Sequence, residues 1–428
     1  MVSILNIWRA AAIAALFALV PLSTASADTL KTLHSFCAAQ GCIDGANPND
    51  LLRDASGNLY GTAQHGGKHH NGIVFKLIPN ADGTMYTEHI LHNFCAKQNC
   101  TDGAYPYGNL IMDVEGNLYG TTIYGGSQSG VVYKMTPGAQ GWSYKVLHTF
   151  CDGNCADGSE PEGGLSYKGQ ASGALWDGTS PLFGATQYGG TGANLGNGVI
   201  YEMTTHPLML YQVIRKFSSG SGPNPVLVDA AGNIFGTTRS GGKYGGGVLY
   251  KLAANNWHET TLHNFCNTAN CADGELPEGR PIMDGAGNLF GATDLGGTSA
   301  YCTSNGGTTC GTVFERTAAG AFGVLYNFCS LPDCTDGEEP FVGIVMDASG
   351  NLFGTTFGGG THDGGVVFKL TPDGTDNILY SFCSAGPPCQ DGANAATPLV
   401  MDADGGLFGT TNNGGANGDH GTVFELKP

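Results

Sequence analysis

The chain has 428 residues, with 18 basic and 36 acidic side chains and a formal net charge of −18 at pH 7. This excess of negative charge argues against nucleic acid or an anionic membrane surface as a partner, because phosphate binding requires a basic footprint. A single ordinary core rarely reaches this length, whereas an array of repeats does. The 70 glycines stand at recurring turn positions, which favours the array.

The first residues have the features of a secretory signal peptide. Arg9 precedes an apolar run, residues 10–22, which ends in the small residues Ala25-Ser26-Ala27. This pattern predicts a signal peptide over residues 1–27 and a secreted or periplasmic protein that begins at Asp28. A transmembrane anchor would need about 20 apolar residues, and this run is shorter. Residues 28–428 are expected to form a single domain.

One short stretch, Asp-x-x-Gly-Asn-Leu-Phe-Gly-Thr-Thr, returns along the rest of the chain. Its clearest copy spans residues 347–356, and a degenerate copy, which keeps only part of the motif, spans residues 181–186. A repeat with intervals of 52 to 64 residues indicates a propeller or another repeat architecture. The glycine after the aromatic residue marks the seven copies: Gly61, Gly120, Gly184, Gly236, Gly291, Gly354 and Gly409.

Each repeat contains four strand-like runs. In the sixth repeat these are residues 343–347, 351–356, 365–370 and 377–382, rich in β-branched and aromatic residues and bounded by Gly, Pro and Asp. No sustained helical period follows the signal peptide. The Asp-x-x-Gly-Asn segment predicts a tight turn, because Asp bonds the backbone two residues on and Gly and Asn tolerate left-handed conformations. A calcium loop would need alternating ligands, which are absent.

The two ends of the chain carry complementary parts of one repeat. Residues 29–36 match the fourth strand of the other repeats, and residues 421–428 match the third strand. We therefore predict an all-β fold: a seven-bladed β-propeller of four-stranded antiparallel blades, closed by pairing the N-terminal strand with the last blade. This closure removes an exposed sheet edge.

The cysteines fall into close pairs. In an exported protein, an even number of cysteines at repeating spacing predicts disulfides. Zinc usually requires a four-ligand layout that these pairs lack. The predicted pairs are Cys37/Cys42, Cys95/Cys100, Cys151/Cys155, Cys266/Cys271, Cys302/Cys310, Cys329/Cys334 and Cys383/Cys389.

One face of the predicted propeller should gather the disulfide loops and the Gly-rich loops between second and third strands. We expect this face to bind ligand through acidic, aromatic and imidazole groups. Three roles stay open for the acidic residues: bonding their own loops, binding calcium, or contacting ligand. No dedicated metal or cofactor site is predicted. The candidates are Asp44, Asp102, Asp157, Asp273, Asp336 and Asp391 in the first loop set, and His65, Tyr124, Tyr188, Tyr244, His362 and His420 in the second.

A second recurring side chain precedes each disulfide loop. The motif Leu-His-x-Phe contains His34, His92, His148 and His263, and Tyr326 and Tyr380 replace the histidine in later repeats. This interchange favours strand packing over metal ligation. The third to fifth repeats are the least regular. Drift in a tolerant loop is the commoner cause of such irregularity, and a binding site that breaks the symmetry is the alternative.

The motifs of common enzyme families are absent: there is no G-x-S-x-G, no H-E-x-x-H, and no phosphate or cofactor loop. We therefore predict a monomeric, non-enzymatic binding or adhesion protein that recognises a glycan or another extracellular polymer. The alternative is a carbohydrate-active enzyme, either a glycoside hydrolase or a polysaccharide lyase. It would use carboxylates and histidines of the third to fifth repeats.

The repeat unit, followed by Gly-Gly, Gly-Val-Val-Phe-Lys-Leu-Thr-Pro and Phe-Cys-x4-Cys-x-Asp-Gly, resembles the GloVer-type tandem repeat of exported bacterial proteins. The resemblance covers nearly all of residues 29–428. It implies a bacterial surface or secreted protein of undefined biochemical role. The family often carries a C-terminal anchor, and no sorting tail follows the last repeat here. The family motif supplies no catalytic residues to carry over.

Overall fold

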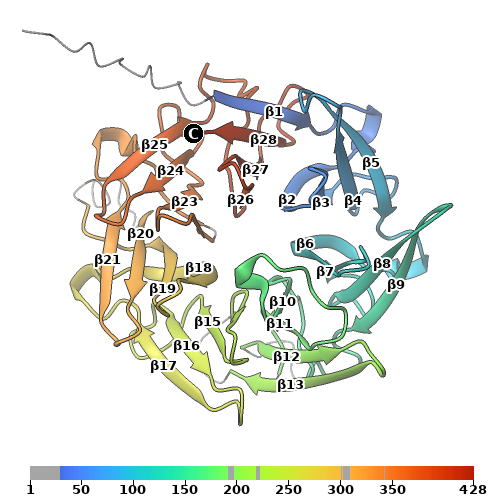
Figure 1. Cartoon of the computed structure of the whole chain (residues 1–428), viewed down its shortest axis with the longest axis horizontal. Coiled ribbons are helices and arrows are strands. Elements are labelled where there is room, and N and C mark those ends of the chain that lie inside the picture. The colour runs from blue at the N-terminus through green and yellow to red at the C-terminus, as the bar shows by residue number, and fades with distance from the viewer. Residues whose placement is uncertain (1–28, 191–196, 218–221, 300, 302–308, 342) are drawn as a thin grey trace, which may run out of the picture.

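The computed structural model describes residues 29–190, 197–217, 222–299, 301, 309–341 and 343–428. The predicted signal peptide and Cys302 lie outside the described residues. Within these ranges the strands form seven antiparallel sheets of four strands each, arranged around a central axis (Figure 1). The predicted seven-bladed β-propeller is confirmed. No helix of the described ranges is long and apolar enough to cross a membrane.

The first strand of each blade lies nearest the axis and the fourth lies at the outside. The first two blades are β2 (Ala46–Arg53), β3 (Leu59–His65), β4 (Ile73–Pro79), β5 (Tyr86–Asn93) and β6 (Ala104–Met112), β7 (Leu118–Tyr124), β8 (Val131–Gly138), β9 (Gly141–Thr149). The third and fourth are β10 (Leu165–Tyr167), β11 (Leu182–Thr186), β12 (Val199–Thr204), β13 (Leu210–Lys216) and β14 (Leu227–Val228), β15 (Ile234–Thr238), β16 (Val248–Leu252), β17 (Glu259–Asn264). The fifth and sixth are β18 (Glu275–Met283), β19 (Leu289–Leu295), β20 (Thr309–Arg316), β21 (Phe322–Asn327) and β22 (Val345–Met346), β23 (Leu352–Thr355), β24 (Val366–Leu370), β25 (Asp376–Ser381).

The seventh blade joins both ends of the chain. It contains β26 (Val400–Met401), β27 (Leu407–Thr411), β28 (Thr422–Lys427) and, as its outer strand, β1 (Thr29–Ser35). Thr29 pairs with Lys427 and Thr32 with Phe424. The predicted closure by the N-terminal strand is therefore confirmed. Short 3-10 helices complete the chain: η1 (Gln40–Cys42), η2 (Gln98–Cys100), η3 (Gln170–Ser172), η4 (Ala269–Cys271) and η5 (Pro332–Cys334).

The recurring Asp forms the predicted turn between the first and second strands. Asp54 Oδ1 accepts hydrogen bonds from the backbone N–H groups of Ser56 and Asn58, both at 2.9 Å, and Oδ2 accepts one from Asn58 Nδ2 at 2.7 Å. Because the carboxylate accepts all three hydrogen bonds, it holds the turn in one conformation. The arrangement recurs at Asp113, Asp229, Asp284 and Asp347.

The recurring glycine makes room for an aromatic ring of the paired strand. Gly120 pairs with Tyr133, and a Cβ on Gly120 would lie 2.6 Å from the Tyr133 hydroxyl oxygen. Phe94 of the preceding blade packs against Tyr133 with ring centroids 5.3 Å apart, so this ring joins the two blades. Equivalent trios are Gly61–Phe75–Phe36, Gly184–Tyr201–Phe150, Gly236–Tyr250–Phe217, Gly291–Phe314–Phe265, Gly354–Phe368–Phe328 and Gly409–Phe424–Phe382.

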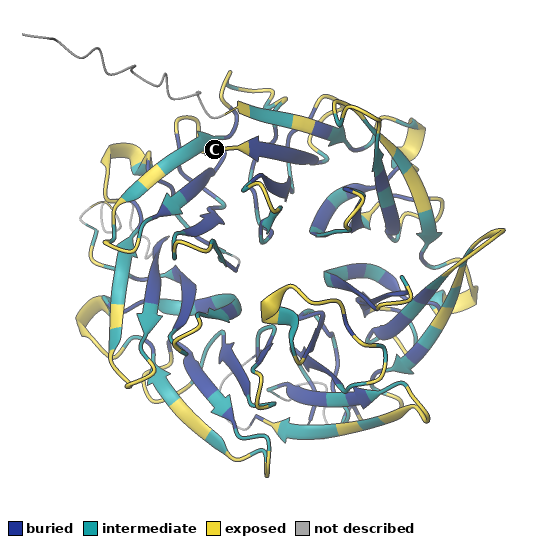
Figure 2. Ribbon diagram, in the orientation of Figure 1, coloured by how far each residue is buried: buried dark blue, intermediate teal, exposed yellow. Residues whose placement is uncertain are grey.

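Burial follows the same radial order. Figure 2 shows the middle strands largely buried and exposed residues concentrated on the outermost strands and loops. The core is a ring of hydrophobic clusters, several of which combine residues of two neighbouring blades. This packing holds the inner strands in place. Side chains on these strands that differ from the repeat motif are therefore held in defined positions.

Candidate functional site

Disulfides close the loops between consecutive blades. Six of the predicted pairs are joined in the described part of the chain, and these are confirmed: Cys37–Cys42, Cys95–Cys100, Cys151–Cys155, Cys266–Cys271, Cys329–Cys334 and Cys383–Cys389. Several disulfides in one chain indicate an oxidising, extracytoplasmic environment.

The seventh predicted pair, Cys302/Cys310, is not among these six. Cys310 begins the buried part of β20 and is itself disulfide-bonded. Its predicted partner, Cys302, lies outside the described residues. The bonded state of Cys310 therefore agrees with the prediction, while its pairing with Cys302 stays a prediction. This pair differs from the others in position, because Cys310 lies in β20, the third strand of its blade, rather than in a loop between blades.

The predicted acidic residues of the disulfide loops between blades bond their own loop. Asp44 accepts hydrogen bonds from the backbone N–H groups of Ala38 at 2.7 Å and Ala39 at 3.2 Å. Asp102 and Asp336 accept the same pair of backbone bonds in their blades. Asp157, Asp273 and Asp391 also accept bonds from backbone N–H groups of their loops. The structure thus shows the loop-bonding role, and direct ligand contact by these carboxylates stays a prediction.

In four blades the His or Tyr of the preceding strand hydrogen-bonds the same carboxylate. The distance from the His263 Nε2 to Asp273 Oδ2 is 2.8 Å, and the hydroxyl of Tyr326 donates to Asp336 at 2.8 Å. An imidazole and a phenol both donate a hydrogen bond, which explains why they interchange between repeats. Burial lowers the pKa of His92 to about 4 despite the neighbouring Asp102 carboxylate. That ring is therefore neutral at physiological pH.

Three of the predicted aromatic and imidazole residues gather on blades one to three. The ring centroids of His65 and Tyr105 lie 5.3 Å apart, and those of Tyr105 and Tyr124 lie 5.8 Å apart. The Glu160 carboxylate, followed by burial, Glu162 and Tyr188, raises the pKa of Tyr124. We call His65, Tyr105, Tyr124 and Tyr188 the aromatic arc. Tyr105 was missed from the sequence, because it follows the disulfide loop and has no aromatic equivalent in most repeats.

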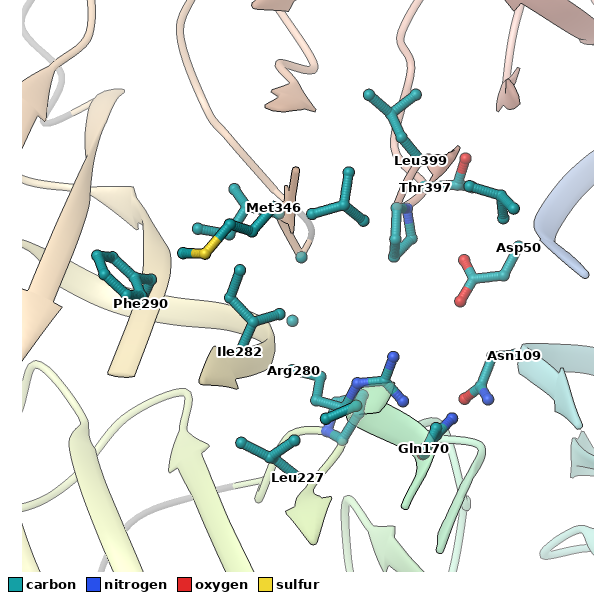
Figure 3. Close-up of a pocket in the computed structure, with 18 of the residues that line it drawn as sticks. Asp50, Asn109, Gln170, Leu227, Arg280, Ile282, Phe290, Met346, Thr397 and Leu399 are labelled. Atoms are coloured by element: carbon teal, nitrogen blue, oxygen red, sulfur yellow. The ribbon is translucent and has the colours of Figure 1, made fainter. Parts of the chain in front are cut away.

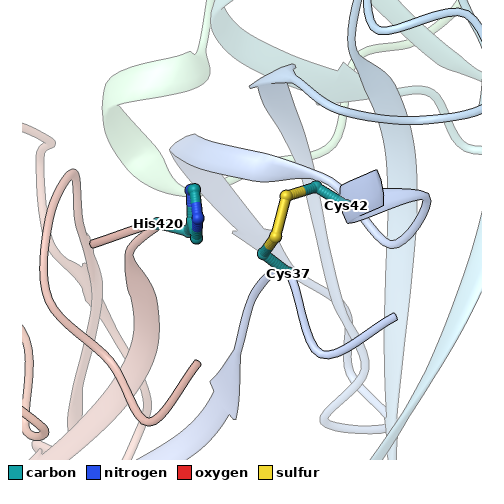
Figure 4. Close-up of side chains that lie close together, drawn as sticks. All are labelled: Cys37, Cys42 and His420. Atoms are coloured by element: carbon teal, nitrogen blue, oxygen red, sulfur yellow. A yellow bond between two sulfur atoms is a disulfide. The ribbon is translucent and has the colours of Figure 1, made fainter. Parts of the chain in front are cut away.

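The remaining candidates lie on other blades. Tyr244 is in the fourth blade beneath the Lys243 ammonium, which lies 5.0 Å from its ring centroid. His362 is in the sixth blade. His420 lies beside the Cys37–Cys42 disulfide (Figure 4), and all three could offer an atom within 4.8 Å of the others. Because the two sulfur atoms are bonded to each other, they are not thiolate ligands, and this trio holds no metal while oxidised.

A cavity of about 1220 Å³ lies inside the ring and is lined mainly by the first strands of the blades. The pairing of β2, β6 and β18 with their neighbours changes register within Pro48–Leu51, Tyr107–Ile111 and Glu278–Ile282. Such bulges redirect side chains. Figure 3 shows Asp50, Asn109 and Arg280, which belong to these bulges, directed into the cavity. In the other blades the matching sequence positions are Gly164, Pro225, Gly343 and Pro398.

Asp50 and Arg280 are available for a ligand. Burial raises the pKa of Asp50 to about 6, and the positive charge of Arg280 opposes the shift. Burial lowers the pKa of Arg280, and Asp50 opposes that shift in turn. Neither side chain hydrogen-bonds another residue in the described ranges. Gln170 of η3, in the long first hairpin of blade three, lines the same cavity (Figure 3).

Four further polar residues line the cavity toward the face of the disulfide loops. We call Tyr107, Glu162, Arg239 and Glu278 the mouth cluster. Arg239 Nε lies 2.9 Å from Glu278 Oε1. Burial raises the pKa of Glu278 to about 8, against the charge of Arg239. Burial, with a contribution from Glu160, raises the pKa of Glu162 to about 7.

The cavity residues can be found in the sequence, but not by searching for the repeat motif. The motif is defined by what recurs, whereas the cavity residues are those that differ at one position of the repeat. Aligning the seven first strands shows Asp50, Asn109 and Arg280 opposite Gly or Pro. That comparison selects them without a structure, but the direction of their side chains depends on the bulges.

Comparison with protein families matches residues 20–181 and 299–428 to the Gloeobacter/Verrucomicrobia repeat. No curated protein matches the chain. Among solved structures, a streptogramin B lyase aligns at 12% identity, with 94% of this chain and 97% of that chain covered and a TM-score of 0.57. A catalytically inactive virginiamycin B lyase from Staphylococcus aureus, solved with quinupristin, aligns at 13% identity, with 94% and 99% covered and a TM-score of 0.57. At these identities the likeness concerns the fold.

Proposed function

The chain belongs to the Gloeobacter/Verrucomicrobia repeat family, and we propose that it is an exported binding protein that holds a neutral glycan chain at the mouth of its central cavity. One observation carries the proposal. The residues that recur between blades form turns, hydrogen-bond their own loops or pack one blade against the next. The polar residues that differ between blades, the mouth cluster with Asp50 and Arg280, converge on one cavity.

The chemistry of the mouth cluster suits sugar hydroxyl groups. A hydroxyl both donates and accepts hydrogen bonds, so its partners must include donors and acceptors. With pKa values near 7 and 8, Glu162 and Glu278 carry protons for part of the time at neutral pH and then donate as well as accept. Arg239 adds fixed donors. A few polar groups in a partly apolar cavity are the usual means of orienting a ligand.

The aromatic arc extends this site across the face of the disulfide loops. Tyr124 is 44% exposed, so its ring is accessible to a ligand that leaves the cavity. Flat rings beside carboxylates offer an apolar surface and hydrogen-bond partners together. A neutral glycan fits better than an acidic one, because the chain carries a net charge of −18.

A second candidate is a carbohydrate-active enzyme at the same mouth. Glu162 and Glu278 come from blades three and five, and their raised pKa values suit a group that transfers protons near neutral pH. A glycosidase uses two such carboxylates, one on each side of the scissile bond. Binding and catalysis at this site are distinguished by whether sugars are released.

The test uses the oxidised full chain and a panel of neutral and acidic oligosaccharides, with binding measured by calorimetry and released reducing sugars measured in the same samples. We expect at least one neutral oligosaccharide to bind. Glu162→Gln replaces the carboxyl group by an amide and should weaken the affinity for that oligosaccharide about 10-fold. This corresponds to the loss of one hydrogen bond worth about 1.4 kcal/mol. Glu115→Gln, on an exposed turn at the opposite face, is the matched control and should bind as the unaltered chain.

Three results would count against the proposal. Failure of every neutral oligosaccharide to bind would exclude the glycan as ligand. Binding that is unchanged in both Glu162→Gln and Arg239→Ala would place the ligand elsewhere. Release of reducing sugars that stops in Glu278→Gln would replace the binding proposal by the enzymatic one.

A further inference from the structure

One contact between neighbouring blades differs from the others in its chemistry. We call the contact between the outer strands of two neighbouring blades a seam. In the seam that closes the ring, β1 of the last blade lies beside β5 of the first. His34 of β1, Asp44 of the first disulfide loop and Glu88 of β5 each offer a ligand atom, and these atoms all lie within 4.8 Å of one another. These residues come from three separate segments.

The groups in this closing seam lack partners for their buried atoms. His34 Nε2 and Glu88 Oε1 are both shielded from solvent without a hydrogen-bond partner among the described residues. They lie 3.9 Å apart, too far for a hydrogen bond. A buried polar atom without a partner is costly. Both atoms therefore lack a partner that a positively charged group lying between them would supply.

Asp44 contributes a carboxylate oxygen within 4.8 Å of the other two groups. Its two carboxylate oxygens accept backbone hydrogen bonds from Ala38 and Ala39, and each oxygen keeps a further lone pair. Backbone bonds of this kind commonly hold a ligating carboxylate in place. The disulfide Cys37–Cys42 closes the loop that carries it.

The other seams use the same positions without forming a three-ligand cluster. Elsewhere the histidine approaches its loop aspartate directly: the distance is 3.5 Å for His92–Asp102, 3.1 Å for His148–Asp157 and 2.8 Å for His263–Asp273. The position of Glu88 holds an aromatic ring in these three seams, which stacks on the imidazole at 4.0 Å (Tyr144), 3.8 Å (Tyr211) and 3.6 Å (Phe322). In the seam between blades three and four, Glu259 holds this position and lies 2.6 Å from Arg215.

We propose that His34, Asp44 and Glu88 bind one divalent transition-metal ion of the zinc class at the ring-closing seam. An imidazole nitrogen with two carboxylates is a ligand set that zinc accepts, with bonds of about 2.0–2.2 Å and a further position for water. Calcium and magnesium prefer oxygen ligands alone. Ligands at such bond lengths lie roughly 3–4 Å apart, so small side-chain rotations complete the site.

The charges of the closing seam agree with this assignment. Burial, together with the Asp44 carboxylate, raises the pKa of Glu88 to about 8, and burial lowers the pKa of His34. A neutral imidazole and a second carboxylate are the forms that ligate a metal, and the ion displaces the Glu88 proton. Bound there, the ion would tie the N-terminal strand to the first blade.

The experiment measures zinc binding to the oxidised full chain after treatment with EDTA, by calorimetry and by metal analysis after dialysis. We expect one tightly bound zinc per chain and a higher melting temperature in its presence, because a ligand that binds the folded state stabilises it. Glu88→Gln and His34→Gln should each weaken zinc binding by at least about 10- to 100-fold and abolish the shift in melting temperature.

The matched control is His92→Gln, which removes the same residue type from the neighbouring seam, where Tyr144 replaces the third ligand. This variant should bind zinc as the unaltered chain does. Equal loss in His92→Gln and His34→Gln, or undiminished binding in Glu88→Gln, would overturn the proposal. The proposal would also be overturned if no zinc bound at millimolar zinc concentration, or if calcium bound in preference to zinc. The glycan assay, carried out with and without EDTA, is a separate readout of the mouth cluster.

Discussion

At the scale of single residues, the glycine after the aromatic is required by the ring above it. A Cβ on Gly291 would lie 2.6 Å from Phe314, whereas a Cβ on Gly285 in the same blade would meet nothing within 4 Å. We expect Gly291→Ala to destabilise the protein by about 1–3 kcal/mol, because the ring must move within a packed core. Thermal unfolding measures this. Gly285→Ala is the control, and an equal fall in its melting temperature would show that contact with the ring is not the cause.

The roles of residues that recur could be predicted from the sequence, whereas the positions of side chains that do not recur depend on the fold. The Asp of the turn and the glycine under the ring have local causes, so a single repeat reveals them. The interchange of His263 with Tyr326 was interpreted as strand packing, but the structure adds a shared hydrogen bond to the loop carboxylate. The partner lies ten residues away in each case, and that proximity arises from the fold of the disulfide loop.

At the scale of elements, each disulfide loop is held by more than its disulfide. In the sixth blade's entry loop, Asp336 accepts backbone bonds from Ser330 and Leu331 and a side-chain bond from Tyr326. The disulfide Cys329–Cys334 closes only a short loop, with a sequence separation of 5. Such a short closure contributes at most about 2 kcal/mol through chain entropy.

We therefore expect the double variant Cys329→Ser with Cys334→Ser to keep the propeller and to loosen one loop. Hydrogen exchange should rise within residues 329–337 and stay unchanged in β23 and β24. The equivalent change at Cys95 and Cys100 should act only on its own loop. Exchange that rises throughout the ring would mean that the disulfides hold the blades together.

The inner strands explain why the cavity was harder to predict than the fold. Regular alternation tells which face of a strand is buried, but β2, β6 and β18 each change register once. A change of register by one residue exchanges the two faces of a strand. Asp50 and Arg280 thus enter the cavity because of a local irregularity that composition and periodicity do not encode.

At the scale of the whole molecule, closing the ring buries carboxylates between blades and around the axis. Glu88, Glu162, Glu278 and Asp376 come from four blades, and burial raises their pKa values to about 8, 7, 8 and 7. In the unfolded chain their pKa values are close to the ordinary ones, 4.5 for Glu and 3.8 for Asp. Between these limits the folded state holds more protons than the unfolded state, so the free energy of unfolding falls as the pH rises.

The melting temperature of the EDTA-treated chain should therefore be higher at pH 7 than at pH 9. A group with a pKa near 8 contributes on the order of 1 kcal/mol over this window. His34 and His92 stay neutral throughout it, because burial lowers their pKa. Glu162→Gln, which imitates the protonated acid, should reduce the loss. A melting temperature that rises from pH 7 to pH 9 would contradict the prediction, because the buried carboxylates would then be ionised and stabilised by the fold.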